Sequence, residues 1–235
     1  MNKSVVKGYM KRLNLIFESI KSLNGGEFLD IHKKVLYLNL LDTMSKGVYE
    51  KEINSSGLRF KTFVTQFSDW DDSNRVSIAQ LKLFIEKHGL SSSKLNEIVY
   101  KYIPKYSECK PTLFNNDPII DELEGICRTE RLFKKVTLND FTHVSLLWSF
   151  RCELVHESRG RGGDELFERM TSPHYIHYFE HNAQKEEYYH WWEILYPLSF
   201  FEALIENSFS NIEVYFLKND INPFDNYNFE KLWID

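Results

Sequence analysis

The first half of the chain repeats apolar residues with the period of amphipathic helices. Over the first 23 residues the apolar positions are Val5, Met10, Leu13, Ile16 and Ile20. The spacing predicts a helix that ends at the glycine-rich turn 24–26. A second helix is predicted over about 28–48, where apolar residues fall on more than one side, so we expect it to be buried. After the turn 54–57, the stretch LRFKTFVTQFSDW has another helical pattern.

Two shorter helices follow, each with a recognisable start or stop. In SIAQLKLFIEKHG, Ser77 is a candidate N-cap and Gly89 a candidate stop. The helix in SSSKLNEIVYKYI begins at one of its serines and ends at Pro104. Three prolines lie in 104–118, and we interpret this stretch as a long connection or an insertion within one helical domain.

Helical periodicity returns after Pro118. The segment 137–140, TLND, resembles a capping box that opens the helix through LLWSFRCELVHE. The stretch 172–217 is predicted to form one or two long helices, kinked or split at Pro197, and the tail 218–235 to be irregular. The pattern therefore predicts an all-α protein with a single domain over 1–235.

Composition narrows the class of protein. Hydrophobic residues make up 43% and aromatic residues 15% of the 235 positions, enough for a packed core. The net charge of -5 excludes a uniformly basic nucleic-acid coat, so any polyanion must be bound by a local basic patch. The three cysteines form no CxxC pair, and we find no signal peptide and no apolar run long enough for a membrane span. We therefore expect a cytoplasmic protein that does not enter the membrane.

Arg151 occupies an unusual position in its predicted helix. On a helical wheel, Val144, Leu147, Trp148, Leu154 and Val155 all fall within about 60° of it. A buried guanidinium needs a carboxylate, a carbonyl cluster, a bound anion or a water-filled cleft, and a structural ion pair is the simplest alternative. His156 lies about 140° around the helix and roughly 7.5 Å along it, on the polar side.

The stretch FRCELVHE resembles the signature of HEPN (higher eukaryotes and prokaryotes nucleotide-binding) proteins. In that superfamily an arginine is followed four to six residues later by a histidine near the end of a bundle helix, as Arg151 and His156 are here. Glu157 and the following SRGRGG resemble the R-N-x-L-V-H-E form of bacterial members. Cys152 stands where the family often has asparagine, and many relatives with altered sites are inactive binding modules.

The resemblance implies an HEPN-like helical bundle with extra helices and a metal-independent endoribonuclease without cofactors. Two protomers would pair to form a composite active site, in which His156 is the general acid or base and Arg151 holds the scissile phosphate. The family analogy also implies a toxin or antiphage defence effector, with an antitoxin or an activating partner.

Further cations are candidates for binding the RNA substrate. Arg159 and Arg161 follow His156 in a glycine-rich loop. A second group recurs at helical spacing and is made up of Arg128, Arg131, Lys134 and Lys135. A local patch of this kind can bind a few phosphates, and a solvated charged surface is the alternative interpretation.

Three histidines suggest a different chemistry. His174, His177 and His181 have the spacing i, i+3, i+7, which places them on one face of the predicted helix, with Glu180 or His190 as a further ligand. Imidazoles in that arrangement bind zinc or another divalent metal. A metal-dependent hydrolase and a catalytically inactive RNA-, nucleotide- or protein-binding module are therefore the two alternatives to the ribonuclease.

Overall fold

The chain folds into two compact units, which are described separately. The computed structural model describes residues 3–90, 93–123, 131–157, 170–182 and 187–227. The first unit comprises Met1–Trp70, Leu154–Ser158 and Phe201–Asp235, and the second comprises Asp71–Glu153 and Arg159–Phe200. The single domain expected over 1–235 remains a prediction.

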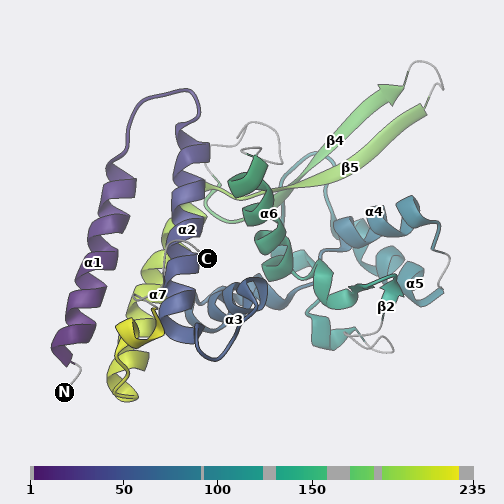
Figure 1. The fold of residues 1–235 in the computed structure, drawn as a ribbon. Helices are drawn as coiled ribbons and strands as arrows, with labels where there is room; N and C mark the ends of the chain where they lie inside the picture. The colour runs from purple at the N-terminus through teal and green to yellow at the C-terminus, as the bar shows by residue number, and fades with distance from the viewer. Residues whose placement is uncertain (1–2, 91–92, 124–130, 158–169, 183–186, 228–235) are drawn as a thin grey trace. The chain divides into compact units, whose positions relative to one another are not determined.

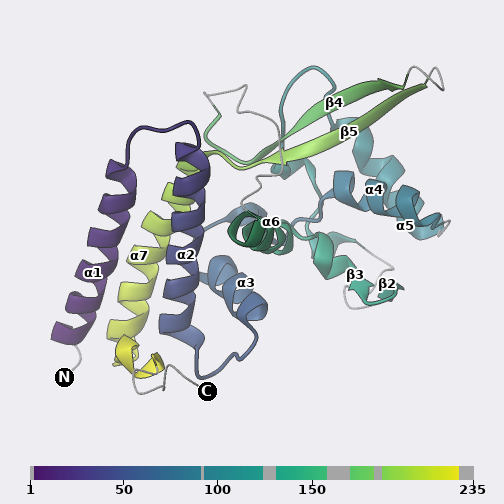
Figure 2. The ribbon, with the colours of Figure 1, turned by 45° about the horizontal axis from the view of Figure 1, so that its top comes forward.

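The first unit is helical. Its helices are α1 (Lys3–Ser22), α2 (Leu29–Tyr49), α3 (Ser56–Phe67) and, from Phe201 onward, α7 (Leu198–Lys218). In Figures 1 and 2, α1, α2 and α7 lie side by side. Aromatic rings fill the space between them, with Phe17 packing edge-on against Phe209 at 5.7 Å and tilted against Tyr37 at 5.8 Å. As predicted, α2 is buried on several sides.

The tail after α7 is held against α2. The 3-10 helix η6 (Pro223–Asn226) follows α7, and Asn226 Nδ2 donates to the Gly47 carbonyl at 2.6 Å. Next to it, the Tyr227 hydroxyl donates to the Thr43 carbonyl at 2.9 Å. The described part of the predicted irregular tail therefore contributes to the packing of the first unit.

The second unit combines helices with short strands. Its α-helices are α4 (Ile78–His88), α5 (Ser93–Tyr102) and the greater part of α6 (His143–Glu157). Its strands are β1 (Thr112–Leu113), β2 (Arg131–Phe133), β3 (Val136–Thr137), β4 (His174–Asn182) and β5 (Glu187–Leu195). Strands β1, β4 and β5 form one antiparallel sheet in that order, and β2 pairs with β3. Figure 1 shows β4 and β5 as a long two-stranded ribbon.

Short 3-10 helices connect these elements. They are η1 (Asp71–Asn74), η2 (Ile103–Lys105), η3 (Phe114–Asn116), η4 (Ile120–Glu122) and η5 (Leu138–Phe141). The predicted connection 104–118 contains no α-helix, yet it carries the buried residues Tyr106, Phe114 and Asp117. It therefore belongs to the core of the second unit.

The predicted cap and stop of α4 are confirmed, whereas the predicted capping box opens a different element. Ser77 caps α4 and accepts from the Gln80 amide at 3.2 Å, and Gly89 ends the helix in the left-handed region with φ of 60°. The capping box at Thr137 also forms, with its amide donating to Asp140 Oδ2 at 2.8 Å. This box opens the short 3-10 helix η5 rather than α6 itself.

The prediction of helix is wrong over the described residues 174–182 and 187–195. Residues 174–182 and 187–195 form the paired strands β4 and β5, whose register runs from His174↔Leu195 to Asn182↔Glu187. Tyrosine, tryptophan and isoleucine favour strands, and cross-strand aromatic pairs stabilise them; Tyr178 stacks on Trp191 at 5.8 Å. The fold is therefore mainly helical with a small antiparallel sheet, and all-α was too strict.

The prediction of a helix is also wrong over the described part of the segment that holds Arg128, Arg131, Lys134 and Lys135. Residues 131–137 form the β2–β3 hairpin, and Lys134 adopts φ of 55°, a left-handed conformation that interrupts a helix. Among the described residues, every helix is too short or too polar to cross a bilayer.

Candidate functional site

Helix α6 carries both residues of the Arg-x4-His motif. It runs from His143 to Glu157, and its buried side is made by Val144, Leu147, Phe150 and Leu154. Their spacing of three or four residues is that of one helical face. The prediction of one helix that holds both motif residues is therefore confirmed over His143–Glu157, and its predicted end before Gly160 lies outside the described residues.

Arg151 lies at the margin of this buried face, not at its centre. The side chain is half-buried, as are Trp148 and Val155, which the helical wheel had placed in the apolar stripe. The guanidinium carbon lies 5.1 Å from the centre of the Trp148 ring, within the range of a cation–π interaction. The guanidinium thus lies against the indole, and the residue as a whole remains partly exposed.

His156 is exposed in the last turn of α6. Five residues along a regular helix correspond to about 140° of rotation and roughly 7.5 Å of translation from Arg151. The helix therefore presents the cation and the imidazole on different sides. The two groups could converge on one phosphate if the last turn of α6 loosened or if a second copy of the helix packed against the first, and the composite site remains a prediction.

The predicted substrate cations are described only in part. Lys134 and Lys135 are exposed at the β2–β3 turn, and Lys134 Nζ lies 5.3 Å from the centre of the Phe133 ring. Arg128, Arg159 and Arg161 lie outside the described residues, as does the side chain of Arg131.

The histidines of 174–181 do not share one face. Successive residues of β4 point to opposite sides of the ribbon, so the odd spacing from His174 to His177 separates them. His174 is buried, with Nδ1 2.9 Å from the Ser172 carbonyl, while His177 Nε2 lies 3.2 Å from His190 Nδ1. The side chain of His181 lies outside the described residues, among which no group of three or more metal-binding side chains occurs.

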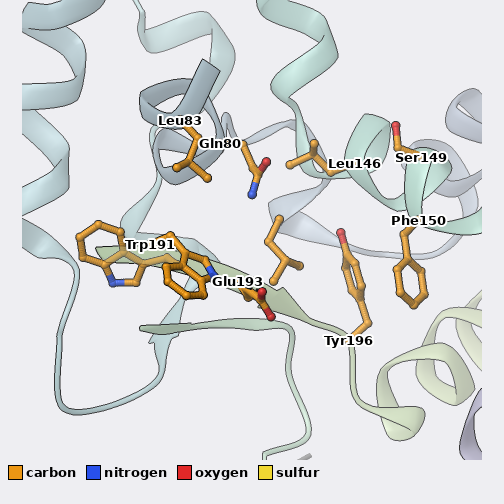
Figure 3. Close-up of a pocket in the computed structure, with 10 residues that line it drawn as sticks. Gln80, Leu83, Leu146, Ser149, Phe150, Trp191, Glu193 and Tyr196 are labelled. Atoms are coloured by element: carbon orange, nitrogen blue, oxygen red, sulfur yellow. Dashed lines mark hydrogen bonds between the residues drawn. The ribbon is translucent and has the colours of Figure 1, made fainter. Parts of the chain in front are cut away.

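A cavity of about 330 Å³ lies beside the middle of α6 (Figure 3). Its walls come from α4, α6 and β5, and its aromatic residues are Phe150, Trp191, Trp192 and Tyr196. Polar groups are few: Trp191 Nε1 donates to Glu193 Oε1 at 3.1 Å, and Figure 3 shows the Gln80 amide directed into the space. A volume of this size with a mainly apolar wall is typical of small-molecule sites.

The second unit also contains a buried polar network that the sequence did not reveal. Its centre is the Asp117 carboxylate, 2% exposed, which lies 2.8 Å from His143 Nε2 and accepts from the Tyr175 hydroxyl at 2.6 Å. Its other oxygen accepts from the Tyr106 hydroxyl and, at 3.1 Å, from the Ile78 amide at the start of α4.

The network joins elements that are distant in the chain. The Tyr175 oxygen also lies 2.7 Å from Ser77 Oγ, which is 98 positions away in the sequence. Burial and the nearby Asp117 charge raise the pKa of Tyr175 well above its ordinary value. No position of the network is accessible to a substrate, so we assign it a structural role in placing β4 against the starts of α4 and α6. Asp117 had been interpreted as part of a connection, and no local sequence signal distinguishes it.

Comparison with known proteins does not identify a relative: no family model, no curated protein and no solved structure matches the chain.

Proposed function

We propose that the protein is a metal-independent endoribonuclease of the HEPN type. The observation that carries the proposal is the position of the two motif residues on α6, with an accessible imidazole in the last turn and a guanidinium held beside Trp148. The resemblance of FRCELVHE to the HEPN signature supplies the reaction class.

The chemistry needs only these two side chains and the RNA. His156 accepts the proton of a ribose 2′-hydroxyl, whose oxygen attacks the adjacent phosphorus while the bond to the 5′-oxygen breaks. An imidazolium then donates a proton to the leaving oxygen. Arg151 donates two hydrogen bonds to the phosphate and stabilises its added negative charge in the transition state. The products are a 2′,3′-cyclic phosphate and a 5′-hydroxyl.

The active enzyme on this proposal is a homodimer. One helix presents Arg151 and His156 about 140° apart, so a two-fold partner supplies the second group over each phosphodiester. Each dimer would hold two composite sites.

The cavity beside α6 provides a place for an unpaired base of the substrate. Its aromatic walls suit a planar ring, and base–aromatic stacking contributes about 1–3 kcal/mol per base. Exposed Lys134 and Lys135, together with Arg128, Arg131, Arg159 and Arg161, are the proposed phosphate contacts. By family analogy the enzyme acts as a toxin or antiphage effector that an antitoxin restrains or a partner activates.

Cleavage of a mixed RNA pool in EDTA tests the proposal. The wild type should release fragments with 2′,3′-cyclic phosphate ends, and Arg151→Ala and His156→Ala should both abolish the reaction. His32→Ala, which removes an exposed histidine of α2, serves as the matched control and should retain full activity. Activity that EDTA removes would contradict the proposal and favour metal-dependent hydrolysis, and RNA binding without cleavage would favour the inactive module.

Mixing two inactive variants tests the composite site. After refolding together, Arg151→Ala and His156→Ala chains form heterodimers in which one of the two sites has both native groups. With random pairing, about a quarter of the wild-type activity should return. If each protomer held a complete site, the mixture would stay inactive.

A further inference from the structure

Two histidines of the β4–β5 ribbon, His177 and His190, face each other through their ring nitrogens. Nε2 of His177 and Nδ1 of His190 lie 3.2 Å apart, and the two rings are nearly parallel, at 9°, with centroids 5.2 Å apart. We propose that this pair is a bidentate site for a late first-row divalent metal such as Zn²⁺ or Ni²⁺.

The spacing of the nitrogens matches that of two ligands on one metal ion. Zinc binds histidine nitrogens at about 2.0–2.1 Å in tetrahedral geometry, which places two such nitrogens about 3.3 Å apart. The pair therefore needs little change in separation. Rotation about the Cβ–Cγ bond, a soft torsion, turns both lone pairs toward a shared ion.

The strand register holds the two imidazoles on one face. His177 pairs with Trp192, and His190 pairs with Phe179. These two cross-strand pairs are neighbours on the same face of the ribbon. His177 packs against Trp192 at 5.0 Å, and that indole is itself buried. The ribbon thus supplies the orientation that a bidentate pair requires.

The neighbouring chemistry favours nitrogen-binding metals over Mg²⁺ or Ca²⁺. Glu180 pairs with Tyr189, and Glu193 pairs with Ile176. Because side chains alternate between the two faces of a strand, both glutamates lie on the face opposite to that of His177 and His190. With no described carboxylate on its face, the pair offers imidazole nitrogens only. These ligands select zinc, copper or nickel, whereas Mg²⁺ and Ca²⁺ prefer oxygen. Water completes the coordination sphere.

A bound ion would tie β4 to β5. The two ligands are separated by 13 positions in sequence, so the metal closes the hairpin between them. This role is separate from the chemistry proposed for Arg151 and His156, which needs no metal, and the two proposals can fail independently.

Titration of the metal-stripped full-length chain with ZnCl₂ in a calorimeter tests the inference, without RNA. We expect one saturable site per chain. His177→Phe and His190→Phe keep an aromatic ring on the strand but remove the ligand nitrogens, and each should weaken binding roughly 100-fold, because the second ligand of a linked pair acts at high effective concentration. His32→Phe is the matched control and should leave the affinity unchanged.

Fluorescence gives a second readout. Ni²⁺ at the pair should quench emission from the adjacent buried Trp192, and the quenching should disappear in His190→Phe. Undiminished Zn²⁺ affinity in both hairpin variants, an equal loss in His32→Phe, or no binding by the wild type at millimolar Zn²⁺ would overturn the inference. RNA cleavage in EDTA should be unchanged in His190→Phe, which separates this test from that of the ribonuclease.

Discussion

Replacement of Asp117 by alanine should destabilise the second unit strongly. The carboxylate has His143, Tyr106, Tyr175 and the Ile78 amide around it, and the substitution removes their shared partner. If each of these four buried groups costs about 1 kcal/mol when left unsatisfied, the loss is about 4 kcal/mol. A loss of this size is a large share of the roughly 5–15 kcal/mol that stabilises a typical domain.

Two milder variants make the estimate specific. Asp117→Asn keeps one acceptor oxygen but turns an amide group toward the remaining donors, so about half of the loss should remain, roughly 2 kcal/mol. Tyr175→Phe removes a single hydroxyl and should cost about 1–2 kcal/mol. The matched control is Tyr100→Phe, because that ring is 76% exposed, and its effect should stay within about 0.5 kcal/mol.

Urea unfolding of the full chain, followed by circular dichroism, measures these differences in the free energy of unfolding. Hydrogen exchange of the first turn of α4 localises them, because the Ile78 amide donates directly to Asp117. The reasoning is refuted if Asp117→Ala lowers the unfolding free energy by less than about 1 kcal/mol, or if exchange in α4 is unchanged.

Three further outcomes follow from the packing. Gly47→Ala should destabilise the first unit by about 1–3 kcal/mol in urea unfolding, since a Cβ there would collide with the Tyr9 hydroxyl. Gly8→Ala on α1, with open space around it, should stabilise the unit by up to about 1 kcal/mol. If both glycine substitutions changed the free energy of unfolding in the same direction, this packing would be contradicted. The free energy of unfolding should fall as pH rises above about 10. Burial and a nearby carboxylate raise the pKa of folded Tyr175, so the unfolded chain loses this proton first. In Tyr175→Phe, the decline of the unfolding free energy with pH, measured by alkaline unfolding, should be shallower. Trp191→Ala should weaken single-stranded RNA binding by about 1–3 kcal/mol in fluorescence anisotropy, and an unchanged Kd would remove the cavity from the substrate path.

The part of the candidate site on helix α6 could be predicted from the sequence, whereas the part that depends on the sheet could not. That Arg151 and His156 lie on one helix, with the histidine near its end, was predictable, because helical periodicity and the glycines after it are local signals. The partly exposed position of Arg151 was not, because the buried face of α6 is chosen by its neighbours and not by the wheel. The cavity and the His177–His190 pair depend on β5, which had been predicted as helix.

Local signals sufficed for α1, α2 and α4, because periodicity, the Ser77 cap and the Gly89 stop act within a few residues of each other. By contrast, the aromatic-rich segments around β4 and β5 have no decisive period, and pairing with each other and with β1 determines that they are strands. The network of Asp117 likewise joins Ser77 to Tyr175 across 98 positions. Such contacts form only when distant segments are brought together, so tertiary structure alone decides which polar residues are buried and which histidines meet.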